Sequence, residues 1–187
     1  MADLLTLGHS NHPIERFIAL LKDAGATAVA DVRSTPYSRF SPQYSKEPLR
    51  KALANAGIAY SFLGMEFGAR SPDPGCYQNG RVQYSRLAQS EAFASGKARI
   101  EVGLKRFKIA FVCAERDPIE CHRALLVARA FSECGNSIAH IHSNGTLENH
   151  PALENRLIGL LNLPLGDTAN AYLIQCEKVG YFDKRMV

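Results

Sequence analysis

The sequence predicts an α/β fold, a three-layer sandwich in which helices cover both faces of a central, mainly parallel sheet of about five strands. Two observations support this prediction. Short apolar runs alternate with amphipathic stretches along the chain, which is the rhythm of β-α-β units. The connections between them are short in the N-terminal third, as in a parallel sheet covered by its crossover helices. The 187 residues, 46% of them hydrophobic, are enough for one domain with a sizeable core.

The N-terminal third supplies three strands and two helices. The apolar run 4–7 predicts the first strand, and the periodic stretch 13–25 predicts a helix with proline at its start and glycine at its end. Residues 28–33 predict the second strand, residues 49–57 the second helix, and residues 60–63 the third strand.

The rest of the chain is less regular. Its expected segments are a long irregular loop at 66–84, a helix at 90–107, a strand at 108–114, a helix at 118–134, a strand at 138–141, a helix at 151–163 and a C-terminal tail at 166–187. Glycine and proline interrupt the loop, and long loops in compact domains are often functional. The tail shows no clear pattern, so surface packing and self-association as a homodimer both stay open for it.

Composition narrows the class of protein. No signal peptide is visible, and no apolar stretch approaches the roughly 20 residues that span a bilayer, so we expect a cytoplasmic protein without a membrane partner. The five cysteines are odd in number and scattered, which predicts free thiols. A net charge of +4 favours an acidic ligand only weakly. Nucleic acid is not excluded, although no basic stripe interleaved with aromatic residues supports it.

The stretch CAERDPIECHRA, residues 113–124, gathers thiol, imidazole, guanidinium and carboxylate groups directly after an apolar strand. The period of two predicts that Cys113 and Glu115 share one face of that strand. Asp117 is a suitable N-cap for the helix that follows, so Cys121 falls near a helix N-terminus, where the dipole favours a thiolate. The neighbouring His122 strengthens the case for a nucleophile or a proton-transfer pair.

Further polar residues follow the other predicted strands. His9 comes after the first strand, Asp31 and Arg33 stand at the end of the second, and Arg70 lies beyond the third. Because ligands bind beyond the carboxyl ends of strands in open α/β sheets, these residues and the 113–124 stretch should line one cleft. The alternatives are structural: an ion pair between Asp31 and Arg33, and a core position for Cys113.

The motifs LGHSNHPIERF, DVRSTPYSRFSPQY, FGAR and CAERDPIECHR, in this order, resemble the family known as domain of unknown function 488, found mainly in bacteria and archaea. The resemblance runs from about Leu5 to Leu161 and departs from the family pattern at Ala69, where a second glycine is more common. It implies an α/β domain with a central sheet. The positions that match the family motifs are His9, Asp31, Arg33, Arg70, Cys113, Cys121, His122 and Arg123.

The sequence favours an enzyme, a hydrolase or transferase dependent on cysteine and histidine, that acts on a small anionic molecule or a nucleotide. It assigns no cofactor. One alternative is a zinc or iron site built from Cys113, Cys121 and His122 with His9 or Glu115, although the cysteine spacing is not that of a usual zinc knuckle. A second alternative is a nucleotide- or nucleic-acid-binding module without catalysis. The candidate catalytic residues are Cys121, His122, Cys113 and His9, and the candidate substrate-binding residues are Ser10, Asp31, Arg33, Arg70, Glu115 and Arg123.

Overall fold

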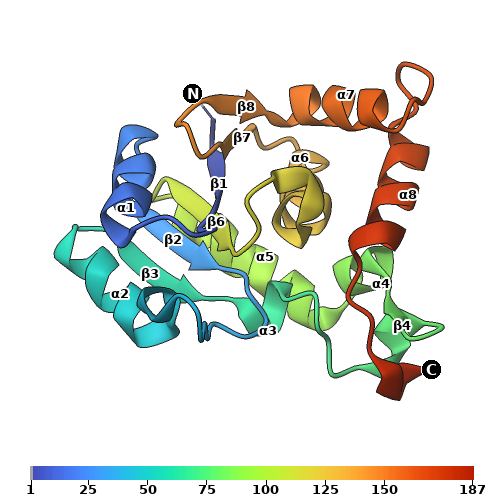
Figure 1. Cartoon of the computed structure of the whole chain (residues 1–187), viewed down its shortest axis with the longest axis horizontal. Helices are drawn as coiled ribbons and strands as arrows, with labels where there is room; N and C mark the ends of the chain where they lie inside the picture. Colours follow the sequence, from blue (N-terminus) through green and yellow to red (C-terminus); the bar gives the residue numbers. More distant parts are fainter. Residues whose placement is uncertain (1) are drawn as a thin grey trace.

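The computed structural model describes residues 2–187 and contains a six-stranded sheet in the order β3-β2-β6-β1-β7-β8 (Figure 1). Its strands are β1 (Leu4–Gly8), β2 (Ala28–Asp31), β3 (Ala59–Phe62), β6 (Ile109–Cys113), β7 (Ile138–Ile141) and β8 (Leu147–Asn149). The first five are parallel to their neighbours, and β8 pairs antiparallel with β7 at the edge. The α/β fold and all five expected strands are therefore confirmed, and β8 is an addition.

Helices lie on both faces of the sheet. They are α1 (Ile14–Asp23), α2 (Lys46–Asn55), α3 (Gly64–Phe67), α4 (Tyr84–Ala88), α5 (Glu91–Leu104), α6 (Arg129–Ser132), α7 (His150–Leu160) and α8 (Thr168–Val179). In Figure 1, α1 and α2 lie on one side of the strands, and α5 and α6 lie on the other.

Two hydrophobic cores follow from the alternation of side chains along the strands. Leu5 and Leu7 of β1 point to the side of α1 and α2, where they pack with Phe17 and Leu53. Leu4, on the same strand, points to the opposite core, which α5 to α8 complete. The central strands are fully buried because both of their faces are covered. This arrangement confirms the three layers.

The loop expected at 66–84 contains a small hairpin. Strands β4 (Tyr77–Gln78) and β5 (Arg81–Val82) pair antiparallel, and Asn79 and Gly80 connect them with φ of 49° and 76°. Positive φ at both central residues is the geometry of a tight hairpin turn, and it explains the Asn-Gly pair.

The tail expected at 166–187 is largely helical. Helix α8 packs against α7, and the chain after it runs back toward the region of β4 (Figure 1). There Val82 of β5 donates its N–H to the carbonyl oxygen of Tyr181 at 2.9 Å. The tail thus packs against the body of the protein, and self-association stays a prediction. Among residues 2–187, no helix is both long and apolar enough to cross a membrane.

Candidate functional site

The site lies at the carboxyl ends of β1 and β6. These strands are neighbours, with Gly8 opposite Cys113, but the chain leaves them toward opposite faces of the sheet. After β1 it enters α1, and after β6 it enters the helical segments of the other face. Such a divergence of neighbouring connections opens a crevice in α/β sheets. Here a pocket of about 420 Å³ occupies that position.

The segment after β6 differs from the single helix expected at 118–134. The Asp117 carboxylate accepts a hydrogen bond from the N–H of Ile119 at 3.1 Å, as expected of a cap, but the turn that it caps is a short 3-10 helix, Pro118–Glu120. Cys121 is extended, with φ of −141° and ψ of 137°, and interrupts the helix. Helical structure resumes with a π-helical segment, Arg123–Ala128, that continues into α6.

This interruption changes the position of Cys121. The residue precedes the second helical segment and does not sit within the first turns of a helix from Pro118, because its extended backbone ends the 3-10 turn. The N–H of Arg123 donates to the Cys121 sulfur at 3.4 Å, and the N–H of Leu125 donates to the Cys121 carbonyl at 3.1 Å. The expected contact of the thiol with a positive helix end is retained at this second helix start.

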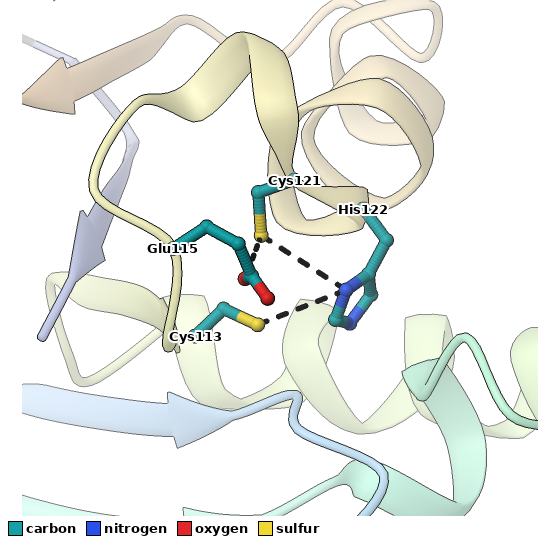
Figure 2. Close-up of side chains that lie close together, drawn as sticks. All are labelled: Cys113, Glu115, Cys121 and His122. Atoms are coloured by element: carbon teal, nitrogen blue, oxygen red, sulfur yellow. Dashed lines mark hydrogen bonds between the residues drawn. The ribbon is translucent and has the colours of Figure 1, made fainter. Parts of the chain in front are cut away.

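Four donor groups converge beside Cys121 (Figure 2). The Cys121 sulfur lies 2.8 Å from a Glu115 carboxyl oxygen and 3.9 Å from Nδ1 of His122, and the Cys113 sulfur lies 3.7 Å from the same nitrogen. All four donor atoms lie within 4.8 Å of one another. We call these four residues the Cys/His/Glu cluster.

Hydrogen bonds and pKa shifts indicate which groups of the Cys/His/Glu cluster carry protons. Nε2 of His122 lies 2.9 Å from the carbonyl oxygen of Val32 and donates its proton there, which directs Nδ1 toward both sulfurs. Burial would lower the pKa of His122, but its contact with Cys121 outweighs burial and raises it. Burial raises the pKa of Cys113, and its neighbour Cys121 raises it further. Cys113 is therefore the protonated thiol of the pair.

The charge of the cluster resides on Cys121. Burial alone would raise its pKa, but the hydrogen bond from Cys113 and the charge of Arg123 outweigh burial and lower the pKa. Burial and the nearby Cys121 raise the pKa of Glu115. Glu115 is exposed as a residue, yet its carboxyl group turns inward to Cys121, and that local contact decides its protonation (Figure 2). Two anions 2.8 Å apart would repel each other, so the two groups share a proton.

A second group of predicted residues surrounds Arg33, which lines the same pocket. Arg33 forms two hydrogen bonds to the Asp31 carboxylate, at 2.8 and 2.6 Å, and its Nη1 donates to Nε2 of His9 at 3.3 Å. Tyr60 donates its hydroxyl to the same carboxylate at 2.8 Å. The ring of His9 stacks on Tyr44 at 4.1 Å between centroids. Arg33 is therefore fixed in place from several sides.

His9 is a neutral ring in this setting. Its Nδ1 donates to the carbonyl oxygen of Ser10 at 2.9 Å, and its Nε2 accepts from Arg33. Burial first, and the charge of Arg33 to a smaller extent, lower the pKa of His9 to about 4. Both nitrogens have protein partners, so His9 holds Arg33 in position.

Arg70 adds a second guanidinium to the pocket from the loop after α3. The side chain is exposed and lies over the ring of Tyr181, 4.6 Å from its centroid, and its backbone N–H donates to the Ser34 hydroxyl at 3.0 Å. The C-terminal segment thus contributes to the pocket through Val179 and Tyr181.

Seven of the ten sequence-predicted site residues line the pocket, namely His9, Arg33, Arg70, Cys113, Glu115, Cys121 and His122. Asp31 is fully buried behind Arg33, and Ser10 lies outside the pocket with φ of 47°. The expectation that Arg123 contacts substrate does not fit its position. This side chain is 0% exposed and donates to the carbonyl oxygens of Glu115 and Arg116 at 2.7 and 3.1 Å.

Sequence reasoning missed several pocket residues. Tyr84, Val179 and Tyr181 come from the hairpin region and the tail, where no motif indicated a site. Tyr37 also lines the pocket, and its loop is rich in proline, serine and aromatic residues, a composition compatible with a loop that covers a substrate or with an ordinary connection. A second cavity, of about 380 Å³ between α4 and α8, contains none of the predicted site residues.

Comparison with known proteins gives a family and a distant structural likeness. A family model described as "Domain of unknown function DUF488" matches residues 13–130. No curated protein matches the chain. A solved structure described as "Putative phosphatase (DUF442)" from Shewanella putrefaciens CN-32 is similar over 97% of this chain and 91% of that chain, with 15% identity and a TM-score of 0.44. Because the family model spans more than half of the chain and includes the whole Cys/His/Glu cluster, the protein belongs to the DUF488 family.

Proposed function

We propose that this protein is an enzyme, a hydrolase or transferase, that acts on a small anionic molecule or a nucleotide in the 420 Å³ pocket. One observation carries the proposal: the activated Cys121 sulfur, 2.8 Å from Glu115, lines the same pocket as the guanidinium groups of Arg33 and Arg70. Perturbed pKa values beside an anion-binding wall are typical of catalytic sites.

Arg33 and Arg70 would bind the anionic group of the substrate. Asp31 uses Nε and Nη2 of Arg33, and His9 accepts one N–H of Nη1, which leaves the second N–H of Nη1 for a ligand. Arg70 is exposed and has no carboxylate partner among its described contacts. A phosphate or carboxylate between the two side chains would receive charge-assisted hydrogen bonds from both.

The Cys/His/Glu cluster would supply the nucleophile and the protons for the reaction. In the metal-free protein, Cys121 is the candidate nucleophile, because a thiolate attacks and a thiol does not. The proton that Glu115 shares with Cys121 is the one that the leaving group would take, and His122, whose pKa is raised by Cys121, is a second candidate donor. Cys121 is only 2% exposed, so a substrate must enter the pocket to reach it.

Anion binding tests the proposal. We expect isothermal titration calorimetry to detect pyrophosphate binding to the wild-type protein and at least tenfold weaker binding to Arg70→Gln. The matched control is Arg50→Gln, whose arginine pairs with Glu47 on the exposed side of α2. Equal affinities for wild type and Arg70→Gln would remove Arg70 from the site, and no binding to wild type would count against an anionic substrate.

Thiol reactivity tests the nucleophile separately. Iodoacetamide labelling near neutral pH, followed by peptide mass spectrometry, should modify Cys121 faster than the exposed Cys134. Labelling of Cys121 and Cys113 no faster than that of Cys134 would contradict the assignment of a thiolate nucleophile.

A further inference from the structure

We infer that Cys113, Glu115, Cys121 and His122 form a binding site for a thiophilic divalent metal ion of the zinc class, at the reacting end of the proposed substrate pocket. Two sulfurs, one imidazole nitrogen and one carboxylate oxygen form a mixed donor set that suits Zn²⁺, which has no geometric preference from its d electrons. This inference assigns a metal cofactor to the proposed enzyme. The role of the metal rests on the proposed function, whereas metal binding itself does not.

The distances fit a tetrahedral centre. Zinc bonds of about 2.0–2.3 Å place neighbouring ligand atoms of a tetrahedron roughly 3.3–3.8 Å apart. Nδ1 of His122 lies 3.7 Å from the Cys113 sulfur and 3.9 Å from the Cys121 sulfur, which is close to that range. The contact of 2.8 Å between Cys121 and Glu115 must widen, and Glu115 is the exposed member of the cluster.

The orientation of His122 is that of a metal ligand. Its Nε2 donates to the Val32 carbonyl at 2.9 Å, which aims the Nδ1 lone pair at the centre of the cluster. Histidines that bind metals usually have their second nitrogen held by a backbone carbonyl or a carboxylate in this way. The imidazole is 8% exposed, so the ring is also fixed by packing.

The charged groups around the cluster suit a site that holds a divalent metal ion. Two thiolates and a carboxylate carry three negative charges, and a divalent ion leaves one of them uncompensated. Arg123 supplies a fully buried positive charge beside the cluster, with its backbone N–H 3.4 Å from the Cys121 sulfur. Among residues 2–187, its Nε has no hydrogen-bond partner, which is unusual for a buried guanidinium.

The backbone that carries the ligands is held in place. The guanidinium of Arg123 donates to two carbonyl oxygens of the loop that bears Glu115. A Cβ at Gly8 would lie 1.8 Å from the Glu115 carbonyl oxygen, so this glycine allows the loop to pack directly on β1. The ligand positions are therefore largely formed before any ion binds, which reduces the cost of ordering them.

A metal changes the role of Cys121 from nucleophile to ligand. Cys113, Cys121 and His122 then form a three-ligand centre, and Glu115, as the exposed fourth ligand, is the one that a water molecule can displace. The bound water would give one proton to the Glu115 carboxylate, and the hydroxide would attack the electrophilic atom of an anionic ester. The bond to the leaving alkoxide would then break, and the alkoxide would take the proton from Glu115.

Cobalt is a suitable probe, because thiolate ligands give Co²⁺ a charge-transfer absorption and a tetrahedral site gives strong visible bands. The untagged, chelator-treated protein should bind about one Co²⁺ per chain with both features and release it to Zn²⁺. Cys113→Ser and Cys121→Ser should each lose the charge-transfer intensity of one thiolate and bind at least tenfold more weakly. The matched control, Cys176→Ser, removes a partly buried thiol outside the cluster and should behave as wild type.

A thermal measurement keeps the test valid if a serine variant is unstable. Zn²⁺ should raise the melting temperature of wild type and Cys176→Ser, and it should raise that of Cys121→Ser much less. Wild-type protein that shows no cobalt spectrum and no zinc-dependent shift would overturn the metal site. Pyrophosphate binding by the chelator-treated protein distinguishes the two proposals. If this protein binds pyrophosphate but not cobalt, the anion pocket is supported and the metal site is not. If it binds cobalt but not pyrophosphate, the metal site is supported and the anion pocket is not.

Discussion

The guanidinium of Arg123 donates a hydrogen bond of 2.7 Å to the carbonyl oxygen of Glu115, so a fully buried side chain of one helical segment holds the loop that precedes it. A second bond of 3.1 Å to Arg116 completes the contact. Arg123 is thus a positioning residue for Glu115 and Cys121, although its sequence context suggested a substrate contact.

Removal of this contact should destabilise the protein. Arg123→Met keeps most of the aliphatic volume but leaves the carbonyl groups of Glu115 and Arg116 without their charged donor, and we expect a loss of about 3 kcal/mol in the free energy of unfolding. Urea denaturation measures the loss. The control Arg50→Met breaks an exposed ion pair and should change the free energy by less than about 0.5 kcal/mol. Equal stability of the two variants would show that the Arg123 contact contributes nothing.

Gly8 offers a test of the close approach between β1 and the loop. Gly8→Ala would place a methyl group 1.8 Å from the Glu115 carbonyl oxygen, which is backbone and must move as a whole. We expect a loss of about 3 kcal/mol or more, together with weaker Co²⁺ binding, because the loop that carries Glu115 is displaced. Gly159→Ala in α7 meets no atom within 4 Å and should stabilise the protein by about 0.5–1 kcal/mol. A neutral Gly8→Ala variant would mean that this loop adapts freely.

The buried pair of Asp31 and Arg33 predicts a difference between two variants. Asp31→Asn leaves a buried guanidinium without its counter-charge and should cost about 3–5 kcal/mol in the free energy of unfolding, with weaker pyrophosphate binding because Arg33 loses its orientation. Tyr60→Phe removes one hydrogen bond to the same carboxylate and should cost about 1 kcal/mol. Equal losses in the free energy of unfolding, measured by chemical denaturation, would show that the charge pair contributes no more to stability than the Tyr60 hydrogen bond.

A buried chain of hydrogen bonds away from the pocket predicts a pH dependence. His140 joins Thr6 at 2.8 Å to His150 at 2.9 Å, and His150 continues to the Tyr172 hydroxyl at 3.0 Å. Burial lowers the pKa of His140 and of His150 below the ordinary value of 6.5. Below pH 6.5 the unfolded chain therefore binds protons that the folded chain does not, and the free energy of unfolding falls as the pH falls.

Each of these two histidines should contribute a slope that approaches 1.4 kcal/mol per pH unit, to order of magnitude, between its unfolded and folded pKa values. His140→Gln removes one titrating group, so the unfolded and folded chains should differ by about one proton fewer. The free energy of unfolding should then depend less steeply on pH. Urea denaturation between pH 5 and pH 7, a range of about two units, gives both slopes. An unchanged slope in His140→Gln would mean that His140 binds its proton equally well in the folded and unfolded chains.

The sequence predicted the parallel core of the fold because its strands are long enough to show a pattern. The run Ile109–Cys113 is apolar throughout, since both faces of β6 are covered, and β1 and β7 are similar. Strand β8 is short and polar, and β4 and β5 have two residues each, so neither periodicity nor propensity marks them. Helix α8 was missed because Leu173 and Ile174 are exposed while Gln175 is buried, which reverses the expected pattern.

The site was predictable to the extent that strand order brings its parts together. Polar residues at strand ends meet at one edge in any parallel sheet, which accounts for His9, Arg33 and Cys113. Side-chain direction was not predictable in the same way. The extended backbone of Cys121 follows from no sequence pattern, and Arg123 turns inward to the loop beside Gly8 of β1. The stacking of Arg70 on Tyr181 depends on a tail with no motif.

The wall formed by Val179 and Tyr181 has a consequence for biosynthesis. These residues follow every other lining residue of the pocket in the chain, so this wall is the last part of the pocket to be synthesised. A chain that ends before Val179 therefore lacks one side of the pocket that contains Cys113 and Cys121.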